Sequence, residues 1–264
     1  MPRSRASDLV IAAAAGYEFA QVRPFFASLR ASGYAGRVRL FVSGLADATL
    51  TLLANLGAEI EPVDPGPGRL SVTRTRFFHA LRFLESAPEP VGRVLLADVR
   101  DVVFQRDPFD FDPGGSVCCF EEEASIPLRS SPINAGWVRQ AFGQAVLDEI
   151  GDDPPCCVGT VFAPCSLMVE YLKRLTGLLS DIRPDFFSSD QAAHIYMVRK
   201  GLVPCLRLFG NDHGPVLTLG TKPAHSVRVN DQGEVVNDDG EVVPVLHQYD
   251  RHPVLQALLR RRFG

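Results

Sequence analysis

The first hundred residues alternate between short apolar runs and segments whose apolar residues recur at every third or fourth position. Apolar runs bounded by turn residues are typical of buried strands, and the second pattern is typical of helices with one buried face. Gly33 and Gly57 follow two of the helical segments, at the place where helices commonly end. The pattern predicts strands at 8–14, 37–43, 58–63 and 93–97, and helices at 18–31, 47–56 and 72–85.

Strands that alternate with helices across short turns indicate βαβ units, in which neighbouring strands run parallel. A Pro-Gly-Pro-Gly sequence at 65–68 predicts a loop before the third helix. We therefore expect an α/β protein whose first half is built around a parallel sheet.

The second half of the chain has a less regular pattern. Strands are expected at 115–120 and 156–162, and helices at 133–150, 164–179 and 190–200. Two turn sequences, at 230–233 and 237–240, bracket short valine-rich segments and predict a small C-terminal β-meander. A short final helix ends in three arginines, and no repeat or clear linker interrupts the chain. We expect a single domain over 1–264, with halves at about 8–113 and about 114–264.

Composition narrows the function classes. The chain has 264 residues, of which 46% are hydrophobic and 22% charged, as is ordinary for a soluble globular protein. A net charge of −4 without a basic stripe argues against nucleic acid as a partner. No apolar stretch is long enough for a transmembrane helix, and the run at 9–15 fits a core strand better than a secretion signal. The arginines at 260–262 allow at most peripheral contact with an anionic membrane.

The six cysteines form no Cys-x-x-Cys pair, and most lie in apolar runs. This usage favours reduced cysteines and a cytoplasmic protein. The spacing of the cysteines does not match a zinc motif, so no zinc site is expected. The sequence shows no nucleophile motif and no positioned base near Cys157, so we interpret Cys157 as a small buried residue.

The candidate chemistry begins with two carboxylates, Asp98 and Asp101, placed where the apolar strand 93–97 ends. Ligands of open parallel sheets bind beyond the carboxyl ends of the strands. Oxygen ligands in such a turn suit a hard cation, Mg²⁺ or Mn²⁺. The alternative is structural, with Asp98 capping a turn and Asp101 pairing with Arg100 on the surface. The spacing alone leaves both interpretations open.

The succession of strand, acidic turn, apolar segment 102–104 and Gln105–Phe109 resembles the metal-binding segment of GT-A glycosyltransferases. That family carries an Asp-x-Asp signature, whereas this chain has Asp98-Val99-Arg100-Asp101. The resemblance implies a Rossmann-like α/β fold with a mixed, mainly parallel central sheet flanked by helices. It also implies that Asp98, Asp101 and the C-terminal His247 hold Mn²⁺ or Mg²⁺. A histidine that ends a valine-rich strand can equally be a hydrogen-bonded core or rim residue.

Other segments resemble the same family in the expected order. The resemblance places the donor nucleotide over the first strand and turn and near the basic residues of the third helix. It places the donor sugar and acceptor along the strand at 157–160 and the Asp-Gln pair that starts the helix at 190. The residues implied to contact the donor are Ala13, Ala14, Tyr17, Arg74, Arg76, Asp98, Gly159, Thr160 and Gln191. Without a ligand, Arg74 and Arg76 would be a solvated helix face, and Asp190 would be a helix N-cap.

The resemblance implies transfer of a sugar from a nucleotide sugar, with UDP favoured, to a carbohydrate, lipid or protein hydroxyl. The resemblance of His247 to the family's C-terminal histidine favours retention of anomeric configuration. The resemblance also makes Asp190 and Arg100 the candidate catalytic residues. The first half would then bind the nucleotide and the second half the acceptor. Two alternatives remain: a non-catalytic nucleotide-sugar-binding module, and a sugar-1-phosphate nucleotidyltransferase. The latter normally has a basic, glycine-rich loop after its first strand, where this chain has only Ala12–Gly16.

Overall fold

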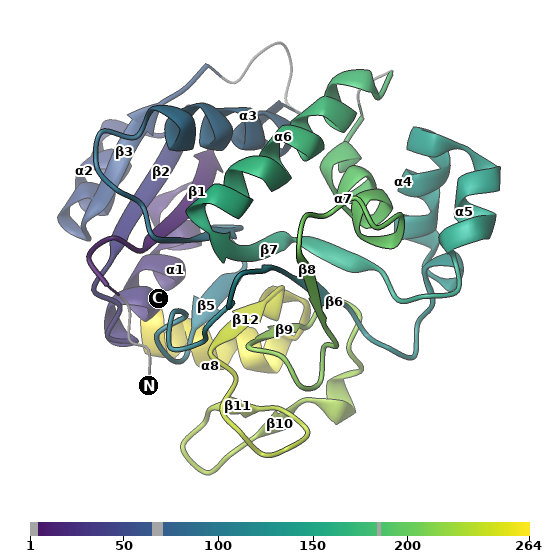
Figure 1. Cartoon of the computed structure of the whole chain (residues 1–264). Helices are drawn as coiled ribbons and strands as arrows, with labels where there is room; N and C mark the ends of the chain where they lie inside the picture. The colour runs from purple at the N-terminus through teal and green to yellow at the C-terminus, as the bar shows by residue number, and fades with distance from the viewer. Residues whose placement is uncertain (1–4, 65–70, 184–185) are drawn as a thin grey trace.

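The computed structural model describes residues 5–64, 71–183 and 186–264, and its elements follow one another as labelled in Figure 1. The strands are β1 (Leu9–Ala15), β2 (Arg37–Ser43), β3 (Ala58–Pro62), β4 (Arg93–Ala97), β5 (Val102–Phe104), β6 (Val117–Glu121), β7 (Cys156–Pro164), β8 (Leu206–Phe209), β9 (Val216–Thr218), β10 (Arg228–Val229), β11 (Val235–Val236) and β12 (Val245–His247). The helices are α1 (Phe19–Ala31), α2 (Asp47–Asn55), α3 (Ser71–Ser86), α4 (Pro132–Phe142), α5 (Gln144–Ile150), α6 (Cys165–Asp181), α7 (Ser189–Arg199) and α8 (Pro253–Phe263).

The central sheet has seven strands in the order β3-β2-β1-β4-β7-β6-β8. Strands β1 to β4 run parallel to one another, as the βα pattern of the first half predicts. Strand β7 runs antiparallel to both β4 and β6, and β8 is parallel to β6. The expectation of a mixed, mainly parallel sheet is confirmed.

The two faces of the sheet bury separate hydrophobic cores because successive strand residues point to opposite faces. On β1, Leu9 and Ile11 join the core that contains Phe77 of α3, whereas Val10 and Ala12 join the core that contains Phe25 of α1. In Figure 1, α3 and α6 accordingly lie on one side of the sheet and α1 on the other.

A second sheet joins the middle of the chain to its C-terminal part. Its order is β5-β12-β9, with β12 antiparallel to β5 and parallel to β9. The register pairs His247 with Val102, the residue that follows Asp101. This pairing brings a residue near the end of the chain to the acidic turn after β4.

The structure corrects two details of the expected second half. The single helix expected at 133–150 is divided into α4 and α5, because Gly143 between them adopts a φ of 89°. The expected meander is reduced to a two-stranded hairpin of β10 and β11 with one antiparallel bridge from Val236 to Val242, and the following β12 pairs with β5 and β9. Strands β8 and β9 were not expected from the pattern, and the 65–68 loop lies outside the described residues.

Within the described ranges, no helix combines the length and the apolar character needed to cross a membrane.

Candidate active site

A cleft of about 530 Å³ opens beyond the carboxyl ends of β1 and β4. Its walls come from β1, α3, the turn after β4, the middle of β7 and the start of α7. This is the edge at which open α/β sheets bind ligands.

Asp98, Asp101 and His247 meet at this cleft. One potential ligand atom from each lies within 4.8 Å of the others. The His247 Nε2 atom lies 3.5 Å from Asp98 Oδ2 and 3.9 Å from Asp101 Oδ1. His247 is fully buried, and its Nε2 has no hydrogen-bond partner among the described residues. A buried imidazole nitrogen that makes no hydrogen bond to a described residue and faces two carboxylates fits the donor set of a divalent cation.

Gly159 makes the space beside this triad. A Cβ atom at this position would lie 2.3 Å from His247 Cε1 and 2.8 Å from Asp98 Oδ2, closer than side chains tolerate. The Gly159 carbonyl also accepts a hydrogen bond of 2.8 Å from the Asp98 backbone N–H. Strand β7 therefore approaches the triad closely only because residue 159 has no side chain.

The pKa values of Asp98, Asp101 and His247 depend on one another and on nearby charged groups. Burial alone would raise the pKa of Asp98, whose side chain is 30% exposed. The nearby Arg76 and His247 have a larger effect in the opposite direction, so the pKa of Asp98 lies below its usual range. Burial raises the pKa of Asp101. Burial opposes a charge on His247, but Cys157, Asp98 and Asp101 outweigh it and raise the imidazole pKa. Without a cation, the two carboxylates thus depend on nearby positive charge.

Arg76 supplies part of that charge from α3. Its Nη1 donates to Asp98 Oδ1, and its Nη2 lies 3.3 Å from Asp190 Oδ2. The Asp190 side chain is only 6% exposed, and burial raises its pKa to about 6 despite the attraction of Arg76. Arg76 therefore joins the acidic turn to the start of α7 and is not part of a solvated helix face.

Arg100 lies at the rim of the cleft. Its guanidinium is 2.7 Å from Asp250 and 3.2 Å from Asp101. The Arg100–Asp101 pair considered from the sequence is present, but Asp101 is buried, with 8% of its side chain exposed. The pair therefore holds a buried carboxylate in place.

Gln191 fixes the wall formed by β7. Its Oε1 accepts a 2.9 Å hydrogen bond from Val158 N–H, and its Nε2 donates to Cys156 O at 3.1 Å. The same amide nitrogen lies 3.4 Å from Glu122 and 3.3 Å from Asn134. Sequence reasoning missed Glu122, although the carboxylate run 121–123 at the end of a predicted strand resembles the signal that pointed to Asp98.

Three residues expected to contact a donor do not line the cleft. Ala14 and Thr160 are buried, because along a strand the side chains alternate and it is Ala13 and Gly159 that face the opening. The Arg74 guanidinium donates instead to the Leu179 carbonyl of α6. Tyr17, Arg76, Asp98 and Gln191 line the cleft as expected.

Residues outside the expected donor contacts complete the cleft. Trp137 and Phe187 lie edge to face, with ring centroids 6.2 Å apart, and the Phe187 side chain is 56% exposed. Ile133, at the start of α4, is 64% exposed beside them. Gln248 follows His247 in the left-handed conformation, with a φ of 58°, which turns its side chain into the cleft wall.

No protein-family model and no curated protein matches the sequence. Solved structures do match. The galactosyltransferase LgtC, in complex with donor and acceptor sugar analogs, has a TM-score of 0.61 at 15% identity over 97% of this chain and 93% of its own. An active-site glutamine-to-glutamate mutant of LgtC gives 0.58 at 14% identity over the same shares. The bifunctional WbbM gives 0.55 at 13% identity over 81% of this chain and 40% of its own. The chain therefore has the GT-A fold.

Proposed function

We propose that this chain is a divalent-cation-dependent glycosyltransferase that moves a sugar from a nucleotide sugar, with UDP favoured, to an acceptor hydroxyl. The observation that carries the proposal is the meeting of Asp98, Asp101 and His247 at the cleft of a GT-A fold. Two carboxylates and one imidazole suit Mn²⁺ or Mg²⁺, and the imidazole favours Mn²⁺ of the two. When bound, the cation supplies positive charge against which a diphosphate can lie.

The chain's own residues then have separate tasks. Arg76 keeps Asp98 and Asp190 in fixed relative positions, because its two terminal nitrogens contact one carboxylate each. Arg100, itself paired with Asp250, contacts Asp101 from the other side. A guanidinium fixed in this way needs little reorganisation when negative charge develops nearby.

Asp190 is the carboxylate we propose to act on the reacting sugar, with Gln191 beside it. Its depth in the cleft and its pKa of about 6 suit a group that accepts a proton or faces developing positive charge. Retention of configuration is proposed on the family resemblance of His247. The half-buried Trp137 and the exposed Phe187, which both line the cleft, fit an acceptor with an apolar face, such as a sugar ring.

The test is a screen of nucleotide-sugar hydrolysis with Mn²⁺, comparing the unchanged protein with Asp101→Ala. We expect Asp101→Ala to lose at least about a hundredfold in rate, since a charge-stabilising group at the reacting centre is removed. The matched control is Asp110→Ala, which removes an exposed carboxylate outside the cleft.

Equal activity in Asp101→Ala and the unchanged protein would contradict the site assignment. Calorimetry with UDP, with and without Mn²⁺, separates binding from turnover. Metal-dependent binding of UDP with no turnover would favour the non-catalytic binding module.

A further inference from the structure

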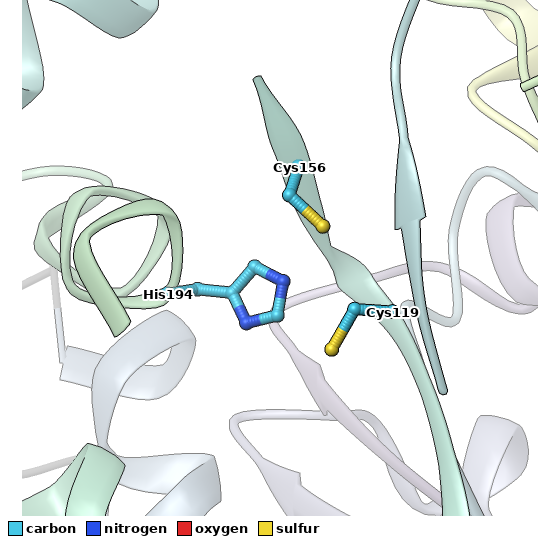
Figure 2. Close-up of side chains that lie close together, drawn as sticks. All are labelled: Cys119, Cys156 and His194. Atoms are coloured by element: carbon cyan, nitrogen blue, oxygen red, sulfur yellow. The ribbon is translucent and has the colours of Figure 1, made fainter. Parts of the chain in front are cut away.

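A second group of potential metal ligands lies in the core, apart from the triad at the cleft. Cys119 of β6, Cys156 of β7 and His194 of α7 are all completely buried. One potential ligand atom from each lies within 4.8 Å of the others. Figure 2 shows the His194 ring directed from α7 toward the two thiols.

The two nitrogens of His194 have different surroundings. Nδ1 lies 2.8 Å from the Tyr171 hydroxyl of α6. Nε2 has no hydrogen-bond partner among the residues described. A buried polar atom without a partner is unusual, and here it belongs to a residue type that commonly binds metals.

We propose that Cys119, Cys156 and His194 form a buried Zn²⁺ site that ties α7 to β6 and β7. Thiolate and imidazole donors select soft or borderline metals and disfavour Mg²⁺ and Mn²⁺. Zn²⁺ also balances the charge of two thiolates, which leaves a neutral site in an apolar core. A monovalent copper ion would leave one uncompensated negative charge there.

The hydrogen bond to Tyr171 fits metal binding. When Nε2 is a ligand, Nδ1 carries the hydrogen and donates it to the tyrosine oxygen, which fixes the orientation of the ring. Binding converts both thiols to thiolates and releases two protons to solvent. The Cys156 thiol, which lies 3.2 Å from the Phe120 carbonyl, then exchanges that contact for the metal.

Such a site would support the cleft without joining in its chemistry. His194 lies one helical turn after Asp190 and Gln191 on α7. Cys156 precedes Cys157 on β7, and the Cys157 thiol lies 3.6 Å from His247 Nδ1, so two adjacent residues of one strand reach the two sites. The missing zinc motif in the sequence is explained by this geometry, because the ligands come from three elements that only the fold brings together.

The test uses the full-length protein, reduced and stripped with a chelator, and then loaded with Co²⁺ or Zn²⁺. Co²⁺ should produce a thiolate-to-metal charge-transfer absorption. Added Zn²⁺ should displace the Co²⁺ and abolish that absorption. Cys119→Ala and Cys156→Ala should each lose the absorption. Cys118→Ala and Cys157→Ala, which remove neighbouring thiols, should keep it. Asp101→Ala should also keep it, because that variant damages only the triad at the cleft.

Tyr171→Phe keeps all three ligands and provides a variant that does not depend on the loss of a thiol. We expect it to retain the absorption but to bind Zn²⁺ about tenfold more weakly, since the partner of Nδ1 is removed. Circular dichroism of each metal-free variant checks that the chain folds. Absence of a thiolate band in the unchanged protein, persistence of the band in Cys156→Ala, or a Cys119–Cys156 disulfide in the protein as isolated would each overturn the proposal.

Discussion

Single residues decide whether the cleft can hold a cation. Gly159 leaves the volume that a Cβ would fill beside His247 and Asp98, and Arg76 keeps Asp98 paired with positive charge. The pKa of Asp190 is raised, whereas that of Asp98 is lowered, because the Asp190 carboxylate is buried so deeply that its ionisation is costly. The arrangement of these residues suits the proposed site but lowers the free energy of unfolding, as is common for preorganised sites.

Gly159→Ala should impair the cation site while leaving the chain folded. The added methyl group would overlap His247 and Asp98, and overpacking of this kind typically costs about 1–3 kcal/mol. We expect Mn²⁺ to raise the unfolding temperature of the unchanged protein but not that of this variant.

The control for this prediction is Gly177→Ala on α6, where an added Cβ meets nothing within 4 Å. That change should preserve the Mn²⁺ effect, and an alanine within a helix should raise stability slightly. An undiminished Mn²⁺ effect in Gly159→Ala would show that the cation does not bind beside this glycine.

Asp190→Asn should stabilise the metal-free protein at pH 7.5. The Asp190 pKa is raised from its ordinary value of 3.8 to about 6, so the folded state holds more protons than the unfolded state between those values. Stability contributed by this group therefore falls as the pH rises through that window. We expect a gain of about 1–3 kcal/mol at pH 7.5, decreasing toward zero near pH 4, by urea unfolding.

Asp110→Asn serves as the comparison, because it makes the same chemical change at an exposed carboxylate outside the cleft. A constant difference between Asp190→Asn and the unchanged protein across pH 4–7.5 would contradict the burial argument. Activity should fall in Asp190→Asn even as stability rises.

Among the elements, β12 supplies the third member of the triad although it has only three residues. It carries His247 and lies between β5 and β9. The neighbouring hairpin is held to this sheet by Gln105, whose Nε2 donates to Val235 O and Val243 O at 2.9 Å each. Its Oε1 accepts a 2.8 Å hydrogen bond from Val235 N–H. One buried amide thus joins the residue after β5 to β11 and to the segment before β12.

Gln105→Ala should destabilise this part of the molecule. The change removes three buried hydrogen bonds, which predicts a loss of about 2–4 kcal/mol, although the Val235 carbonyl keeps its bond from Val243 N–H. Urea unfolding measures the loss. Gln144→Ala, at an exposed amide on α5, should cost less than about 1 kcal/mol. Similar losses in the two variants would contradict the clamping role of Gln105.

Across the whole molecule, the part that could be predicted is the part specified by local pattern. The alternating strands and helices of the first half follow from apolar periodicity, and Asp98 and Asp101 follow from their place after β4. The pairing of β12 with β5 could not be predicted in this way, because nothing in either short apolar segment specifies its partner. The position of His247 beside the acidic turn was available only through the family resemblance.

The same reasoning explains the residues that were missed or misplaced. Glu122 has a strand-end signal, but its contacts with Asn134 and Gln191 join three elements that are distant in sequence. Ala14 and Thr160 were expected at the cleft because the resemblance selects a segment, whereas strand alternation selects only every second residue of it. Spacing rules for zinc likewise describe ligands on one local motif and cannot detect a group assembled by the fold.

The pairing of His247 with Val102 also means that the parts of the triad are synthesised at different times, with the two aspartates long before the histidine. During translation, β1 to β4 and the acidic turn leave the ribosome long before β12 is made, and N-terminal parts of a chain generally begin to fold first. A nascent chain can therefore form the parallel strands while Asp98 and Asp101 still lack their imidazole neighbour. Closing the contact between β5 and β12 brings together segments far apart in sequence, a slow kind of step in folding. A cation that takes all three residues as ligands could thus bind only after β12 has been synthesised.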